Sequence, residues 1–192
     1  MKSSNLKIKI VDNHEEQLKA NLVRAIVYMH EQNCPYEEEF DLNDFTATQI
    51  IGLLDNEPIL TARIRYFGDF VKFERLAIRS QFRGMKYGHM LLQFMLDVAE
   101  QKGFSKCYLH AQKRLQSFYE GYGFEVVGNE FNFSDHDYIE MVNTFHKSAA
   151  VFEIGDNPHL INRPEGQWNL AGPIEQSLNR TNHTQVSYLG RG

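Results

Sequence analysis

The spacing of hydrophobic and polar positions changes from a period of two to a helical period near the start of the chain. Alternation over residues 6–10 predicts a first strand. Apolar side chains then recur every three or four positions over residues 14–31, which predicts an amphipathic helix. Asn13 and Glu16 have the spacing of a capping box at the start of this helix, and Pro35 closes it.

Three more strands are expected next. Residues 48–54 and 59–67 have the pattern of strands, and residues 55–58 form a turn sequence between them. The chain turns again at Gly68-Asp69 and enters a strand at residues 71–79.

The strand at residues 71–79 contains a change of phase. Its first apolar side chains, Val71 and Phe73, stand at odd positions, whereas Leu76 and Ile78 stand at even positions. A slip of one residue in a period-two pattern is what a β-bulge produces. The alternative is that the first residues of the strand simply pack differently at its end.

A short basic turn with two glycines follows this strand. Residues 83–88, Arg-Gly-Met-Lys-Tyr-Gly, lead into an amphipathic helix from His89 to Lys102. Backbone N–H groups and the positive end of the helix dipole meet at such a turn, and Gly84 and Gly88 have no Cβ to keep phosphate oxygens away. The turn therefore predicts a site for an anion such as a pyrophosphate. An ordinary strand-to-helix turn is the alternative.

Strand and helix patterns continue after this helix. The sequence predicts a strand at residues 107–112, a helix at residues 114–121, and strands at residues 124–128 and 137–143. The complete order is β-α-β-β-β-α-β-α-β-β, a mixed α/β arrangement.

Residues 145–192 differ from the rest of the chain. Asn, Gly, Pro and Gln become frequent, and helical periodicity survives only weakly around Ile174–Leu178. We therefore expect a domain at residues 1–144 and a C-terminal extension at residues 145–192. The extension is expected to be a mobile tail, an arm packed on the sheet, a contribution to a dimer or the start of a second module.

Composition and charge limit the classes of function. A chain of 192 residues with 42% apolar residues is expected to form a globular domain. The net charge of −5 argues against non-specific binding to nucleic acid or to an anionic membrane. The sequence has no apolar run of about 18 residues, so no membrane span is expected. The first residues lack the apolar core of a secretory signal. A cytoplasmic protein is therefore expected.

The cysteines and histidines predict no metal site. Cys34 and Cys107 do not have metal-binding spacing, and Cys107 lies in an apolar strand, so reduced thiols are expected. The eight histidines show no ligand pattern such as His-Glu-x-x-His.

Three segments together resemble a known family. The turn at residues 83–88 precedes Leu109-His-Ala-Gln112, and the stretch Phe118-Tyr-Glu-Gly-Tyr-Gly-Phe-Glu-Val-Val-Gly128 follows. In this order they resemble the GNAT superfamily of acetyl-CoA-dependent N-acetyltransferases, especially its small bacterial branch. The resemblance covers roughly residues 5–143. It implies a mixed, mostly antiparallel twisted sheet flanked by helices.

One position of the turn departs from the family pattern. The family usually has Arg/Gln-x-x-Gly-x-Gly/Ala, and Lys86 stands where the middle glycine is expected. A lysine ammonium placed on a phosphate would compensate for the change, but the added Cβ stands where the backbone approach is tight. Arg83, Gly84 and Gly88 remain in register.

The resemblance implies that acetyl-CoA binds as a co-substrate, without a metal. Its pyrophosphate is expected at the turn, and a backbone N–H freed by the bulge is expected to contact the thioester carbonyl. The amide of Gln112 matches a family position that holds a pantetheine amide. The expected cofactor-binding residues are Leu76, Ala77, Ile78, Arg83, Gly84, Met85, Lys86, Tyr87, Gly88, His89 and Gln112.

Three residues are expected to carry the chemistry. Tyr119 matches the family tyrosine whose hydroxyl lies on the cofactor sulfur, and a phenol with a pKa of about 10 stays protonated at neutral pH. A tyrosine buried on a helix face is the alternative. Glu74, just before the bulge, is the leading base for the amine, unless Arg75 pairs with a neighbouring carboxylate and Glu74 is structural. His110 is the second candidate because its pKa of about 6.5 suits proton relay, and a chain of waters is a third route.

The acceptor is expected to be the primary amine of a small molecule or peptide. Five carboxylates lie close together after the first helix, where proteins of this fold usually border the acceptor cleft. They are Glu37, Glu38, Glu39, Asp41 and Asp44. A solvated acidic loop is the first interpretation, and a cleft that attracts a cationic amine is the second.

A different class of function is also compatible with the sequence. The chain would then be a non-catalytic module that binds acyl-CoA and acts as a sensor or regulator. Intact Tyr119 and Glu74 favour catalysis over a sensor, which needs neither residue. A homodimer is one expected assembly, and neither a nucleic acid nor a membrane is an expected partner.

Overall fold

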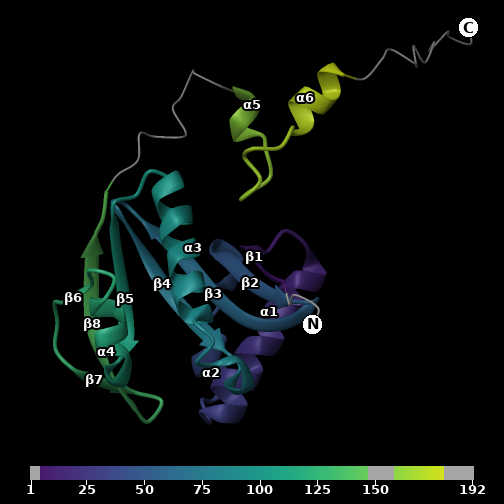
Figure 1. Cartoon of the computed structure of the whole chain (residues 1–192). Coiled ribbons are helices and arrows are strands. Elements are labelled where there is room, and N and C mark those ends of the chain that lie inside the picture. The colour runs from purple at the N-terminus through teal and green to yellow at the C-terminus, as the bar shows by residue number, and fades with distance from the viewer. Residues whose placement is uncertain (1–4, 147–157, 180–192) are drawn as a thin grey trace, which may run out of the picture. The chain divides into compact units, whose positions relative to one another are not determined.

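The structure, a computed structural model, describes residues 5–146 and 158–179 (Figure 1). These residues belong to two units, residues 1–151 and residues 152–192. The first unit contains the sheet and every candidate site residue named above. In the described residues, no helix is both long enough and apolar enough to cross a membrane.

Eight strands form a single mixed sheet in the first unit. Their spatial order is β1-β2-β3-β4-β5-β8-β6, and β7 pairs with β8 off this path. The strands are β1 (Leu6–Ile10), β2 (Thr48–Leu54), β3 (Glu57–Phe67), β4 (Phe70–Ile78), β5 (Lys106–Gln112), β6 (Glu125–Val126), β7 (Phe131–Phe133) and β8 (His136–Thr144). Every neighbouring pair is antiparallel except β4 and β5, which are parallel. The predicted fold class is therefore confirmed.

Helices occupy the positions between the strands. They are α1 (His14–Arg24), a π-helix (Ala25–Glu31), α2 (Tyr36–Glu39), α3 (Tyr87–Gln101) and α4 (Gln116–Glu120) in the first unit, and α5 (Pro158–Ile161) and α6 (Pro173–Leu178) in the second. Short 3₁₀ turns lie at Asp44–Thr46, Ser80–Phe82 and Lys113–Leu115. The Asn13 side chain caps α1 by accepting a hydrogen bond from the Glu16 N–H at 2.9 Å, as the sequence predicted.

Two elements differ from the sequence prediction. The prediction of a single helix over residues 14–31 is wrong in its second half. The α-helix ends at Arg24, and a π-helix continues to Glu31. The apolar periodicity did not indicate that the last turns of the predicted helix are π-helical. The strand β7 was not predicted, because its three residues are too few to show a period and it exists only as a hairpin partner of β8.

Apolar side chains cover both faces of the sheet. Leu92 and Met95 of α3 belong to the main core with Ile50 of β2, whereas Ala20 of α1 packs with Ile51 on the opposite side. Adjacent residues of β2 therefore point to different helices, and Figure 1 shows α3 crossing one face. Burial on both faces explains why β2 is apolar at nearly every position.

A bulge in β4 creates the opening that holds the candidate site. Glu74 pairs with Arg63 of β3 and Ala77 pairs with Thr61, so two residues of β4, Arg75 and Leu76, stand opposite one residue of β3. Arg75 has a φ of 55°, in the left-handed region. The bulge predicted from the phase change is thus confirmed.

The strands β4 and β5 separate just before the bulge. They pair only from Val71 to Phe73 and from Cys107 to Leu109, and from there they diverge (Figure 1). The unpaired ends of both strands face the resulting gap.

The second unit contains two short helices. Arg163 Nη2 forms an ion pair with Glu175 Oε1 at 2.6 Å, and the Gly172 N–H donates to Glu175 Oε2 at 2.9 Å. The weak periodicity near Ile174–Leu178 corresponds to α6. The extension predicted for residues 145–192 lies outside the described residues at 147–157 and 180–192.

Candidate active site

Two adjacent cavities lie where β4 and β5 diverge. The first, of about 350 Å³, lies between the bulge, the end of β5 and the β7–β8 hairpin. The second, of about 360 Å³, lies between the end of β4, the start of α3 and α4. Both cavities are lined by Leu76, Arg114 and Tyr119, so they meet at these side chains.

The structure brings nearly all predicted site residues to these cavities. The three predicted catalytic residues, Tyr119, Glu74 and His110, line the first cavity, together with Gln112. The predicted cofactor-binding residues that line the second cavity are Leu76, Ala77, Ile78, Arg83, Gly84, Lys86, Tyr87, Gly88 and His89. Met85 is the exception, because its side chain is about half exposed and lines neither cavity.

The turn before α3 keeps the backbone shape that glycines normally supply. Gly84 has a φ of 77°, and Lys86, the N-cap of α3, has a φ of 63°. A left-handed conformation costs a non-glycine residue about 1–2 kcal/mol, so Lys86 adopts the glycine-like conformation at some cost. No side chain of the described residues caps the first turn of α3. The His89 and Met90 N–H groups donate to the Lys86 carbonyl, and the Tyr87 and Gly88 N–H groups remain available to an anion.

The Arg83 guanidinium is already engaged by protein groups. Its Nε donates to the Ile78 carbonyl at 2.8 Å, and its Nη2 donates to Glu31 in the π-helix. Glu31 also accepts a hydrogen bond from the Ser80 N–H at 3.1 Å. These contacts fix the turn relative to the π-helix.

Tyr119 presents its hydroxyl at the junction of the cavities. The residue lies on α4, is 6% exposed and packs against Phe124. Within the described segments, its hydroxyl has no hydrogen-bond partner. Burial raises the pKa of Tyr119, so the phenol keeps its proton at neutral pH and is able to donate it.

His110 is held by a hydrogen-bonded chain to Glu140. The Tyr108 hydroxyl lies 2.7 Å from His110 Nε2 and donates its proton to Glu140 Oε1. A hydroxyl has one proton, so Tyr108 accepts a hydrogen bond from Nε2–H of His110. In the neutral ring, Nδ1 is then the nitrogen with a free lone pair.

The pKa of His110 is lowered from its usual value of 6.5. Partial burial is the main cause, and the Lys72 ammonium adds to it, while Glu140 and Glu74 act in the opposite direction. The imidazole is therefore neutral at pH 7 and able to accept a proton.

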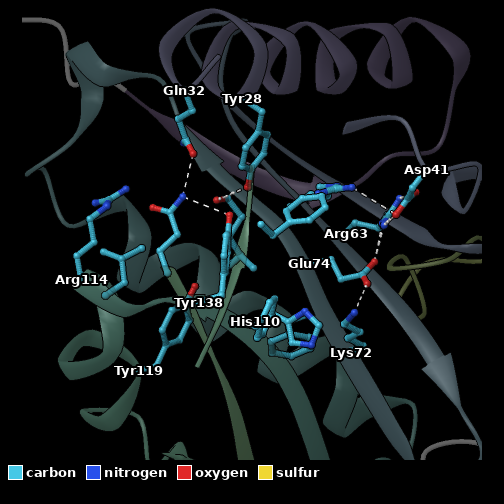
Figure 2. Close-up of a pocket in the computed structure, with 17 residues that line it drawn as sticks. Tyr28, Gln32, Asp41, Arg63, Lys72, Glu74, His110, Arg114, Tyr119 and Tyr138 are labelled. Carbon is cyan, nitrogen blue, oxygen red and sulfur yellow. Dashed lines mark hydrogen bonds and ion pairs between the residues drawn. The ribbon is translucent and has the colours of Figure 1, made fainter. Parts of the chain in front are cut away.

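Glu74 is surrounded by cations (Figure 2). Arg63 Nη2 lies 2.6 Å from Glu74 Oε2, and Lys72 Nζ lies 2.9 Å from Glu74 Oε1. Burial acts to raise the pKa of Glu74, but Arg63 and Lys72 outweigh it and the pKa is lowered. A carboxylate held in this way has little affinity for a proton.

Three of the five acidic residues after the π-helix are engaged by arginines. Glu39 is fully buried and lies 2.5 Å from Arg24, which is also fully buried. Asp44 pairs with Arg24 at 2.6 Å, and Arg63 holds both Asp41, at 2.7 Å, and Asp44, at 2.9 Å. The solvated-loop interpretation is therefore wrong for Glu39, which is fully buried, and arginines also engage Asp41 and Asp44. The cleft that attracts a cationic amine stays a prediction, and Asp41 lines the first cavity.

Sequence reasoning missed three polar residues of the site. The Tyr28 hydroxyl donates to the Leu76 carbonyl at 2.9 Å. Gln112 Nε2 donates to Gln32 Oε1 at 2.9 Å and to the Tyr138 hydroxyl at 3.3 Å (Figure 2). Tyr28 and Gln32 reach the strands through the π-helix, which the apolar pattern did not reveal. No signal in the sequence pointed to Tyr138.

The comparisons with known proteins agree with this geometry. The profile of the acetyltransferase (GNAT) domain matches residues 24–145. An uncharacterised N-acetyltransferase of Bacillus subtilis, YjcF, is 30% identical over 122 residues, which cover 63% of this chain and 87% of that protein.

Solved structures show the same fold. An acyl-CoA N-acyltransferase from Pseudomonas aeruginosa matches with a TM-score of 0.66 and 28% identity, over 74% of this chain and 100% of that one. Escherichia coli ElaA matches with a TM-score of 0.64 and 30% identity, over 73% and 99% of the two chains. Because the GNAT profile covers more than half of the chain, the protein belongs to the GNAT family of acetyltransferases.

Proposed function

We propose that the protein transfers an acetyl group from acetyl-CoA directly to a primary amine, with both substrates bound together. Acetyl-CoA occupies the second cavity, its pyrophosphate at residues 83–88, and the amine occupies the first. The observation that carries this assignment is the junction of the two cavities at Leu76 and Tyr119. The similarity to an acyl-CoA N-acyltransferase supports the choice of cofactor.

The uncapped start of α3 supports a pyrophosphate at the turn. The N–H groups of its first turn and the helix dipole favour negative charge there. Gly84 and Lys86, both left-handed, shape the backbone around the anion. Lys86 adds an ammonium at the position of the family's glycine, so we assign it a contact with a phosphate.

We assign the general base to His110 rather than to Glu74. His110 is neutral at pH 7 and has a free Nδ1, whereas the cations around Glu74 hold its charge and weaken it as a base. The role of Glu74 is then to keep Arg63 and Lys72 in place.

The reaction follows from these positions. The neutral amine, its ammonium proton already lost to solvent, attacks the thioester carbonyl, and its nitrogen gives a proton to Nδ1 of His110 as the C–N bond forms. Backbone N–H groups near Leu76–Ile78 stabilise the developing oxyanion. The C–S bond breaks, and Tyr119 donates its proton to the departing thiolate. The proton on His110 restores the Tyr119 phenol by way of solvent.

Release of free thiol from acetyl-CoA tests this function. We expect turnover with at least one class in a panel of amino acids, polyamines, aminoglycosides and peptides, and loss of most turnover in His110→Gln. Saturable acetyl-CoA binding by calorimetry, with no thiol release above the hydrolysis background for any amine, would identify a non-catalytic acyl-CoA-binding module instead.

A further inference from the structure

The first cavity has more positive than negative side chains in its wall. Its cations are Arg63, Lys72, Arg75 and Arg114, and its carboxylates are Asp41 and Glu74. Arg63 contacts both carboxylates, at 2.7 Å and 2.6 Å. Arg63 also pairs with Asp44, and Arg75 pairs with Asp41 at 3.3 Å and with Glu39 at 3.5 Å. The whole network still has more cations than carboxylates: Arg24, Arg63, Arg65, Lys72 and Arg75 against Glu39, Asp41, Asp44 and Glu74, and Arg114 adds another cation to the wall.

Two of these cations keep bonding capacity. The bulge places the Arg75 side chain in the wall, where Nη2 donates to the Glu38 carbonyl at 2.8 Å and to Asp41 Oδ2 at 3.3 Å, and Nε lies 3.5 Å from Glu39 Oε2. Nη1 of Arg75 has no hydrogen-bond partner in the described parts of the chain. Lys72 has three N–H donors and contacts Glu74 at 2.9 Å.

The phosphates of acetyl-CoA do not account for this charge. The turn expected to bind them lines the second cavity, whereas Arg63, Lys72 and Arg75 line only the first. The pantetheine arm and the acetyl group are uncharged. The positive charge that the carboxylates leave over is therefore available to an anionic group of the acceptor.

An aromatic wall faces the same space. Phe131 and Tyr138 stack at 5.7 Å across the β7–β8 hairpin, and Phe133 lies edge-on to Tyr138 at 6.3 Å. All three side chains line the first cavity. This surface suits an apolar or planar group next to the charged end.

We propose, building on the acetyl transfer proposed above, that the acceptor is a primary amine that carries an anionic group and an apolar side chain, as an aromatic amino acid does. Lys72 and Arg75 bind the anionic group, and the hairpin aromatics bind the side chain. The same cations disfavour an ammonium beside them, so they also help to deliver the amine in its neutral, nucleophilic form.

Matched pairs of amines test this proposal. The kcat/KM for phenylalanine is compared with that for phenylalaninamide, and that for phosphoethanolamine with that for ethanolamine. The expected result is a preference of roughly tenfold or more for the anionic member of at least one pair, decreasing as salt is added. The pair that shows the preference identifies carboxylate or phosphate as the anion.

Variants of Lys72 assign the preference to the cavity. Lys72→Met should reduce the ratio within a pair, and Lys72→Arg should retain it. Because both kcat/KM values of a pair are measured on the same variant, their ratio is unaffected by a general loss of activity. The matched control is Lys113→Met, since Lys113 is an exposed lysine that lines neither cavity.

Three outcomes would overturn the proposal. Equal kcat/KM for both members of each pair would remove the anionic acceptor but leave acetyl transfer standing. If Lys72→Met and Lys113→Met reduce the preference for the anionic amine equally, that preference does not originate in the cavity. Bound acetyl-CoA with no turnover on any amine would overturn the proposed function and this inference together.

Discussion

Tyr108, His110 and Tyr119 determine where protons reside around the junction of the cavities. Tyr108 directs its proton to Glu140 and leaves Nδ1 of His110 with a lone pair. Tyr119 keeps its proton because burial raises its pKa. One side chain is therefore ready to accept a proton and another to donate one, which is what the proposed reaction requires.

Tyr119→Phe is expected to lower turnover without loss of acetyl-CoA affinity. The substitution removes only the hydroxyl, and the ring still packs against Phe124. Positioned general acids contribute about 10²–10⁴-fold, so the decrease in single-turnover rate is expected in that range. Calorimetry with coenzyme A is the control. An unchanged single-turnover rate would remove Tyr119 from the mechanism.

The pH dependence of turnover reports on His110. Its folded-state pKa is lowered, so the neutral, active form persists to a lower pH than for an ordinary histidine. We expect kcat at saturating substrates to rise as the pH increases through a value below 6.5 and to level off by neutral pH. His110→Gln should abolish this limb, and the same limb in the variant would show that another group titrates.

At the scale of elements, a bulge, a π-helix and a turn assemble the site. The bulge separates β4 from β5, and the π-helix supplies Tyr28 to the Leu76 carbonyl and Glu31 to Arg83. Each departs from regular geometry. Such departures are often found near functional sites because they redirect side chains that a regular element would point elsewhere.

Two substitutions of Lys86 separate the charge of the turn from its backbone shape. Lys86→Gln removes the ammonium but keeps the Cβ, so CoA is expected to bind up to about fivefold more weakly, the range of an exposed ion pair. Lys86→Gly removes the left-handed strain as well, and its melting temperature is expected to be at least that of Lys86→Gln. Pantetheine lacks the pyrophosphate and is the control ligand for calorimetry. Equal losses for CoA and pantetheine would contradict a phosphate contact.

The arginine–carboxylate cluster between α1 and β3 is expected to make stability depend on pH. Partial burial acts to raise the pKa of Asp41, but its hydrogen bonds from Arg63 outweigh it and the pKa lies well below 3.8. The unfolded chain therefore binds the proton more tightly. Asp41 stabilises the fold above pH 3.8, and this contribution is lost as the pH falls below that value.

Asp41→Asn tests this linkage. The variant is expected to unfold about 1–3 kcal/mol more easily at pH 7, because a charged hydrogen bond to buried Arg63 is lost. The difference from the unsubstituted protein should shrink as the pH falls toward 3. Urea unfolding over a pH series measures both quantities, and a difference that is constant with pH would contradict the role of Asp41.

At the scale of the whole molecule, much of the fold was predictable from the sequence. Period-two and helical patterns located most strands and the helix α3, and the phase change near Leu76 located the bulge. The strand β6 lies within the predicted strand at residues 124–128, whereas β7 depends on its pairing with β8, and local patterns carry little information about such pairing.

The site was predictable only in part. The turn and Tyr119 could be placed through the family resemblance, because neighbours in sequence determine their local structure. The engagement of Glu39 and Asp44 by Arg24 could not be placed, since it joins residues from separate elements. The chain of Tyr108, His110 and Glu140 spans two strands that pair only in the folded sheet.

Direct transfer between substrates bound at adjoining cavities is the central claim, and a single-turnover experiment with isotope-labelled acetyl-CoA tests it. Enzyme in excess is mixed with labelled acetyl-CoA and an amine that supports turnover, and protein and amine are analysed by mass spectrometry over time. The account predicts that the label appears on the amine at the rate at which free CoA appears, while the protein mass stays unchanged. A labelled protein that forms before the acetylated amine, or free CoA without any labelled amine, would contradict the account.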